Sequence, residues 1–372
     1  MAADDETGTF AIPSTAATLT AAYAGSWVVP ELADIPGLHV VPLNSFRPYD
    51  PMRPVTYVLD TDVLIAMQRF CFAPARLGAR VEAVRHLITN LLARDVLPGP
   101  ALAQLYQPTR THIEPRAALE ARAAFESLMA LSRAAIMDQR RAPGTFSSTD
   151  ELDIAGAGDI PQMLCMYAGV LRLRHLWNPA HTLQERTERF EAFVRWLRVE
   201  LRLNSALLAQ VAFNLWISDG AAQRQASRLL RFRAGPVTDT TLGELWGTAY
   251  DLFLVGGQID ATQVADVLDP VILTFDHGLA GMRDFFEHIR IGDLDATGSH
   301  FGYAPNSRVN MKLHPRLGHL KPRVAELVAE LHSDAVTRLE DGDTMAFDRE
   351  RLRALIEREE SLAKAPPLVQ DA

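Results

Sequence analysis

The sequence predicts an α/β protein: a three-layer α/β/α core with a short parallel sheet, a large α-helical insertion and a helical C-terminal extension. Two short apolar runs predict the core, because each stops at an aspartate and leads into a helical pattern, at residues 56–60 and 271–276. A buried strand followed by a helix is the repeating unit of parallel sheets. Long stretches with helical spacing of apolar residues lie between and after these runs, and they predict the insertion and the extension.

The chain divides into segments where its pattern changes. Residues 1–54 are rich in Ala, Thr and Pro and form an N-terminal extension. The first half of the core covers 55–109, and the second half covers 236–295. A helical insertion fills 110–235 between them, and a basic loop with C-terminal helices covers 296–372.

The elements of the first half and of the insertion follow from local patterns. Strands are expected near 56–60 and 95–98, and helices begin near Asp62 and just after Pro98. Apolar residues at helical spacing predict a helix over 78–94. In the insertion the same spacing predicts helices over 115–137, 161–177, 183–201, 205–217 and 221–232, with a loop over 138–160.

The second half begins with a helix over 241–255, which Gly256 and Gly257 are expected to end. A third strand is expected near 271–275, followed by a helix from Gly278. The remaining expectations are a last core helix over 283–288, an edge strand at 289–291 and two amphipathic helices within 322–364.

The composition is that of a globular protein, with 48% hydrophobic and 22% charged residues in 372. A formal net charge of −9 argues against a surface that binds nucleic acid all over, although it leaves room for local basic patches. Cys71 and Cys165 give neither a disulfide framework nor zinc-ligand spacing. The acidic start lacks the pattern of a signal peptide, and no apolar stretch is long enough for a membrane span, so we expect a cytoplasmic protein without a membrane partner.

Carboxylates gather near the ends of the predicted strands. Asp60 ends the first strand and Asp276 ends the third. The carboxyl ends of parallel strands face the crevice where α/β sheets bind ligands, so we expect Asp60 to be functional. The simplest role of Asp62 is to cap the helix that follows, and metal binding is its second candidate role. Asp251 lies on helix 241–255, on the same face as Glu244.

Taken in order, these motifs resemble the PIN-domain nucleases. That family has an apolar strand ending in D-T-(N/S/D)-V-L-I, here DTDVLI from Asp60, a helix with D-(L/A)-x-(I/L)-(A/V), here DLFLV from Asp251, and a strand ending in T-x-D, here TFD up to Asp276. The resemblance covers about residues 55–106 and 240–290. It implies a PIN-like core and metal-dependent hydrolysis of single-stranded or structured RNA, with these three acids as metal ligands and a role as a toxin or defence enzyme.

The expected cofactor is Mg²⁺ or Mn²⁺, because clustered carboxylates need a counter-charge and these cations prefer hard oxygen ligands. Such a metal activates water and stabilises the leaving oxygen in phosphodiester hydrolysis. The sequence departs from the family at Gln104, which stands where a glutamate completes the acidic cluster. Gln104 offers an oxygen without a charge. Glu244 is the candidate for supplying the missing carboxylate, and its alternative role is a solvated position at the margin of the helix.

Two tracts without acids carry the predicted contacts with nucleic acid. The first lies on the predicted helix 221–232, and the second lies near residues 308–323. Basic tracts beside an acidic site suit a phosphate backbone, although such runs are more often solvated faces. The candidate residues are Arg224, Arg228, Arg231, Arg308, Lys312 and Arg316.

Two other functions compete with the nuclease. Gln104 favours a PIN-like protein that lacks activity and binds RNA or a protein partner, for which the helical insertion offers a surface. The pair Asp60 and Asp62 also fits the D-x-D start of a haloacid-dehalogenase-like phosphotransferase or a metal-binding glycosyltransferase motif. A phosphatase of the first kind uses a later lysine, and the chain has no lysine between its two acidic halves. The oligomeric state is left open.

Overall fold

The computed structural model describes most of the chain between its ends. The described residues are 30–42, 55–92, 94–138, 160–203, 205–261, 271–282, 286–288, 307–309, 313–341 and 347–364. Most of the N-terminal extension, most of the loop 138–160 and the predicted strand at 289–291 lie outside these ranges.

A mixed sheet lies at the centre of the first half of the chain. Its strands are β1 (His39–Pro42), β2 (Thr56–Leu59), β3 (Asp95–Leu97) and β4 (Val271–Thr274), in the order β1-β4-β2-β3. β2 pairs in parallel with both β3 and β4, which confirms the three strands that the apolar runs predict. β1 pairs antiparallel with β4, so the expectation of a purely parallel sheet is wrong. The N-terminal segment contributes an edge strand, for which one bonded neighbour suffices.

Side chains of the sheet alternate between two hydrophobic clusters. Val58 and Ile272 face one cluster, and Tyr57, Leu59 and Leu273 face the other. This is the period-two alternation of a strand whose two faces are both buried. Helices therefore cover both faces of the sheet, as the sequence predicts, and the molecule has the coarse α/β class.

One layer consists of helices from the first half of the chain. They are α2 (Pro30–Ala33), α3 (Thr61–Phe72), the 3₁₀ segment Pro74–Arg80, α4 (Val81–Leu91), α5 (Gly99–Tyr106), α6 (Pro115–Met129) and α7 (Arg133–Met137). α6 packs against α3 and α5, so it belongs to this layer although the sequence assigns it to the insertion. The single helix expected over 115–137 is interrupted, because Ser132 caps a new helix by accepting a hydrogen bond from the backbone of Ala135 at 3.2 Å.

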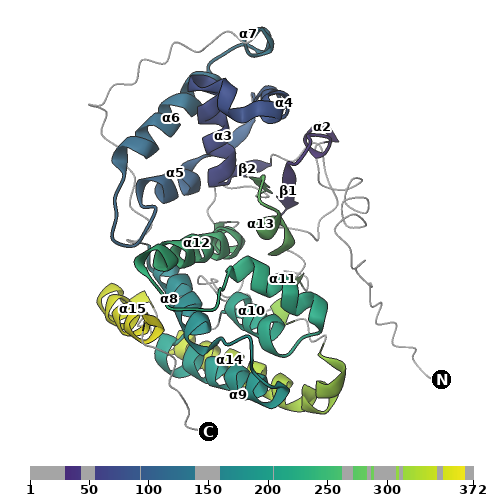
Figure 1. Ribbon diagram of the computed structural model, residues 1–372, viewed down its shortest axis with the longest axis vertical. Coiled ribbons are helices and arrows are strands. Elements are labelled where there is room, and N and C mark those ends of the chain that lie inside the picture. Colours follow the sequence, from purple (N-terminus) through teal and green to yellow (C-terminus); the bar gives the residue numbers. More distant parts are fainter. Residues whose placement is uncertain are drawn as a thin grey trace, which may run out of the picture.

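A helical body covers the other face, below the sheet in Figure 1, with α12 between the two parts. Its helices are α8 (Pro161–Leu176), α9 (Leu183–Trp196) with the π turn Leu197–Leu201, α10 (Ala206–Trp216), α11 (Gly220–Leu230), α12 (Asp239–Ala261), α14 (Lys321–Glu340) and α15 (Arg349–Lys364). These boundaries agree closely with the predicted helices. α12 differs, since it continues through Gly256 and Gly257; a glycine inside a helix costs only about 1 kcal/mol, which packing along α8 offsets.

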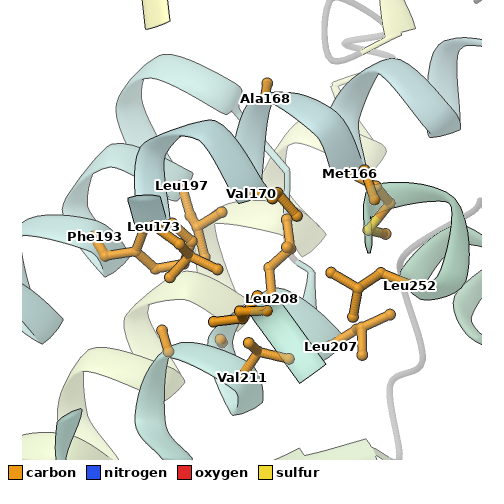
Figure 2. Close-up of a cluster of buried hydrophobic side chains, with 14 of the residues drawn as sticks. Met166, Ala168, Val170, Leu173, Phe193, Leu197, Leu207, Leu208, Val211 and Leu252 are labelled. Carbon is orange, nitrogen blue, oxygen red and sulfur yellow. The ribbon is translucent and has the colours of Figure 1, made fainter. Parts of the chain in front are cut away.

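The centre of the helical body is a close contact between α8 and α10. Figure 2 shows apolar side chains from α8, α9, α10 and α12 meeting around Leu208, which is fully buried. A Cβ atom added at Gly169 would lie 2.5 Å from a methyl carbon of Leu208. Gly169 therefore lets the backbone of α8 approach α10 as closely as it does.

The C-terminal helix α15 is held against α8 by polar side chains as well as by apolar packing. Glu360 accepts hydrogen bonds from Arg110 at 2.8 and 2.9 Å and from the hydroxyl of Tyr167 at 3.0 Å. The fully buried Glu359 accepts from the indole nitrogen of Trp196 at 3.1 Å. α15 thus connects the helical body to the start of the segment that follows α5.

The segment after β4 departs from the prediction. It forms α13 (His277–Met282) and then β5 (Phe286–His288), which pairs antiparallel with β6 (Ser307–Val309). The helix expected over 283–288 is therefore wrong at residues 286–288. A 3₁₀ segment, Pro315–Leu320, precedes α14. No helix among the described residues is long and apolar enough to cross a membrane.

Candidate active site

Asp60 stands where β2 ends and α3 begins. Its Oδ1 accepts a hydrogen bond from the backbone of Thr61 at 2.6 Å, which makes Asp60 the cap of α3. Its Oδ2 accepts from the hydroxyl of Thr274, the last residue of β4, at 2.7 Å. Only 5% of Asp60 is exposed. The carboxylate is therefore held between two neighbouring strands at the carboxyl edge of the sheet.

Asp62 takes a different role from the expected helix cap, which is Asp60. Its two carboxylate oxygens lie 3.2 and 3.0 Å from the backbone nitrogen of Phe275, which donates to them from the end of β4. The reason is that α3 begins directly after Asp60, at Thr61, which puts Asp62 in the first turn of the helix, facing the end of β4. Asp62 thus joins the acidic cluster, and its second candidate role, metal binding, stays a prediction.

Asp276 and Asp251 complete the group from two other elements. Asp276 precedes α13, and its Oδ1 accepts from the backbone of Gly278 at 2.6 Å. Asp251 comes from α12, and its side chain is only 13% exposed. The fully buried Trp246 and Tyr250 fix α12 here, since they donate to the backbone carbonyls of Gln107 and Pro100, respectively.

Burial and mutual repulsion raise the pKa values of these acids. Burial raises the pKa of Asp62 to about 7, and the charge of Asp60 adds to the effect. The pKa of Asp251 lies well above its usual range, first because of burial and then because of Asp60. Burial also raises the pKa of Asp60, although its hydrogen bonds from Thr274 and Thr61 oppose the shift. The acids thus interact electrostatically as one cluster that lacks positive charge.

Arg231 supplies part of that charge. Its Nη2 lies 2.8 Å from Oδ2 of Asp276 and 3.6 Å from Oδ2 of Asp251. Arg231 ends α11 in the left-handed conformation, with φ of 51°, which is uncommon outside glycine. The sequence places it in a tract for nucleic acid. The structure instead brings it to the acids, because α11 ends at Arg231 and the left-handed backbone there departs from the helical row of Arg224 and Arg228.

The structure separates Gln104 from Glu244. Oε1 of Gln104 accepts a hydrogen bond from the hydroxyl of Thr61, the residue between Asp60 and Asp62, so Gln104 borders the acidic cluster. Glu244 lies about 10 Å along α12 from Asp251, the length of seven residues of helix. Its carboxylate is 3.9 Å from the guanidinium of Arg233. Glu244 is therefore not placed to supply the carboxylate that Gln104 lacks.

Two histidines that the sequence did not single out lie beside the site. The rings of His39 and His277 are 4.3 Å apart. His39 is paired with Thr274 across β1 and β4, which brings an N-terminal residue to the edge where the acids lie. Burial and the neighbouring His277 lower the pKa of His39, and Asp276 opposes the shift. The only signal in the sequence was the short extended run at 38–41, whose partner strand lies more than 200 residues away.

The second basic tract lies near the start of α11. The backbone of His314 donates to Ile217 at 2.9 Å, and a β-bridge joins Leu313 to Ser218. Arg316 is exposed in the adjacent 3₁₀ segment. Arg308 belongs to β6, and Lys312 lies outside the described residues. The two predicted tracts are thus neighbours in space at this point.

The donor set fits a hard divalent cation. Asp60, Asp62, Asp251 and Asp276 offer carboxylate oxygens, and the charges of the other three raise the pKa of Asp251. Among the residues that the structure describes, no three Asp, Glu, His or Cys side chains meet as a ready metal-binding group. The guanidinium of Arg231 instead supplies a positive charge next to Asp251 and Asp276. Binding a metal would therefore require the acids to draw together and Arg231 to withdraw.

The chain was compared with protein-family models, curated proteins and solved structures, and none of them matches it. The functional argument consequently depends on the chemistry of the site.

Proposed function

We propose that this protein is a PIN-like nuclease that hydrolyses RNA with Mg²⁺ or Mn²⁺ held by Asp60, Asp251 and Asp276, and that it acts in the cytoplasm as a toxin or defence enzyme. One observation carries the proposal. Acids from the end of β2, from α12 and from the end of β4 lie near enough to influence one another's charge at the carboxyl edge of the sheet, where α/β proteins bind ligands.

Residues of the chain would orient the carboxylates that hold the metal. When bound, the metal supplies Lewis-acid activation of the phosphodiester and of the attacking water. Thr61 and Thr274 orient the carboxylate of Asp60 through hydrogen bonds of 2.6 and 2.7 Å, so its remaining lone pairs point in fixed directions. The backbone of Phe275 holds Asp62 in the same way. Such orientation is what neighbouring groups contribute to a metal site.

A second candidate function is RNA or protein binding without catalysis. Gln104 in place of a glutamate favours it, as does the ion pair that Arg231 makes with Asp276. A haloacid-dehalogenase-like reaction gains no such support, because the cation placed beside the acids is an arginine and not the lysine that this chemistry uses.

The direct test is cleavage of labelled single-stranded RNA with Mn²⁺ or Mg²⁺ and with Asp276→Asn. Asparagine also caps helices well, so α13 should survive while the charge is lost. We expect cleavage to fall on the order of 100-fold or more. Asp34→Asn makes the same change at an exposed position and should cleave like the wild type. A wild-type protein that binds RNA but leaves it intact with either metal would favour the binding function instead.

Gln104→Glu tests whether the acidic cluster is one carboxylate short. Since Glu244 faces Arg233, it does not supply a carboxylate to the cluster, and the new carboxylate would stand beside Thr61 at the border of the cluster. We expect Mn²⁺ affinity, measured by calorimetry, to rise about tenfold and cleavage to increase. Gln184→Glu, an exposed change on α9, is the control. An unchanged or weaker affinity in Gln104→Glu would mean that the site is already complete.

A further inference from the structure

A pocket lies next to the acidic cluster and shares Arg231 with it. The pocket has a volume of about 220 Å³ and is formed by residues 231–236, Thr238, the first turns of α12 and one residue of α8. Arg174, Arg231 and Arg233 line it together with Glu244. The lining therefore carries a net positive charge. Its α12 residue Glu244 lies on the same face of the helix as Asp251.

The wall of the pocket is held in place by Arg174. Its guanidinium donates to the backbone carbonyls of Arg233 at 3.0 Å and Gly235 at 2.7 Å, and it lies over the ring of Trp177. Thr238 then caps α12, since its hydroxyl accepts from the backbone of Thr241 at 3.3 Å. The wall thus ends at a helix N-terminus, where the helix dipole favours an anion.

Two arginines of the pocket have side chains that can engage a ligand. Arg233 is 79% exposed, and its nearest acid, Glu244, is 3.9 Å away. Arg231 is 46% exposed and bound to the acids. Arginine is the side chain best suited to a phosphate group, because its planar fork of N–H donors matches phosphate oxygens. A phosphate in the pocket could therefore bind Arg233 directly. It could bind Arg231 only after the Arg231 side chain has left the acids.

We propose that this pocket binds a phosphate group of the RNA next to the one that is cleaved, and that Arg231 moves from Asp251 and Asp276 to that phosphate when a divalent cation enters the acidic cluster. The inference rests on the proposed nuclease function. Arg231 and the cation compete for the same carboxylate oxygens, and their like charges repel each other. The released guanidinium has the pocket beside it, so the cation and the phosphate favour each other's binding.

Calorimetry with Mn²⁺ alone tests the competition. Arg231→Gln removes the competing charge and should bind Mn²⁺ about tenfold more tightly. Arg231→Lys keeps a cation and should stay near the wild type. Arg133→Gln makes the same change at an exposed position on α7 and should have no effect. Equal or weaker Mn²⁺ affinity in Arg231→Gln, in a variant whose thermal unfolding shows it to be folded, overturns the competition.

Inorganic phosphate tests the pocket, with and without saturating Mg²⁺. Arg233→Gln should weaken phosphate binding about fivefold or more in both conditions, whereas Arg231→Gln should weaken it only when Mg²⁺ is present. Phosphate affinity that is the same in Arg233→Gln and the wild type overturns the pocket. Failure of the nuclease proposal is recognised separately, since in that case Asp276→Asn would leave Mn²⁺ affinity unchanged.

Discussion

Asp251→Asn is expected to raise the melting temperature of the metal-free protein at pH 8 and, at the same time, to lower metal-dependent RNA cleavage on the order of 100-fold or more. The side chain of Asp251 is 13% exposed, and Arg231 approaches it only to 3.6 Å. Its charge is therefore poorly compensated in the folded protein, although it is the charge that a cation needs. Stability and function make opposite demands at this position.

The raised pKa values determine how the stability of the folded protein changes with pH. The folded-state pKa of Asp62 is raised to about 7, against about 3.9 in an unfolded chain, and that of Asp251 is raised as well. Between these values the folded state holds protons that the unfolded state has released, so stability falls as pH rises from about 4 to about 7. Asp251→Asn removes one of these groups and should flatten the fall.

Thermal unfolding in a chelating buffer from pH 5 to pH 8 measures both quantities, with the exposed Asp34→Asn as the control. Added Mn²⁺ should stabilise the wild type most at high pH, because metal binding displaces protons. An Asp251→Asn variant that is less stable than the wild type at pH 8, with an equally steep pH dependence, would show that Arg231 compensates Asp251 well.

Leu208→Ala is expected to lower the free energy of unfolding by about 2–5 kcal/mol. Leu208 is fully buried, and its methyl groups lie directly on the backbone of α8 at Gly169, as Figure 2 shows for its surroundings. The close-packed neighbours have little freedom to fill the space that its removal leaves.

Denaturant unfolding measures this loss, and Val199→Ala is the matched control. Val199 belongs to the same helical body but is 64% exposed, so its truncation should change stability by less than about 0.5 kcal/mol. A loss of under 1 kcal/mol in Leu208→Ala would mean that α8 and α10 close over the gap.

The parts of the fold that the sequence predicts are those with local signals. β2 and β4 are continuous apolar runs that end at acids, and the helices of the helical body have capping residues such as Thr182, whose capping box opens α9. Gly256 is an instructive failure, because a local stop signal in α12 is overridden by packing along α8.

The parts that were missed depend on contacts between distant residues. β1 has an ordinary extended pattern, and only its pairing with β4 makes it part of the sheet and brings His39 to the site. Arg231 looked like one more member of a basic helix face, because nothing local shows that it reaches Asp276, 45 residues later. The order of Asp60, Asp251 and Asp276 could be predicted from motifs. The arginine that pairs with two of these acids, Arg231, could not.

The contact between α15 and α8 bears on when the acids become aligned during synthesis of the chain. α8 packs along α12, the helix that carries Asp251, and α15 covers α8 through Glu360 and its partners Arg110 and Tyr167. While the chain emerges from the ribosome, β2 and α12 are both synthesised before residues 349–364. We therefore expect the acids to be aligned only after α15 has left the exit tunnel. Under the proposed nuclease function, a nascent chain would then leave the messenger RNA that encodes it uncleaved.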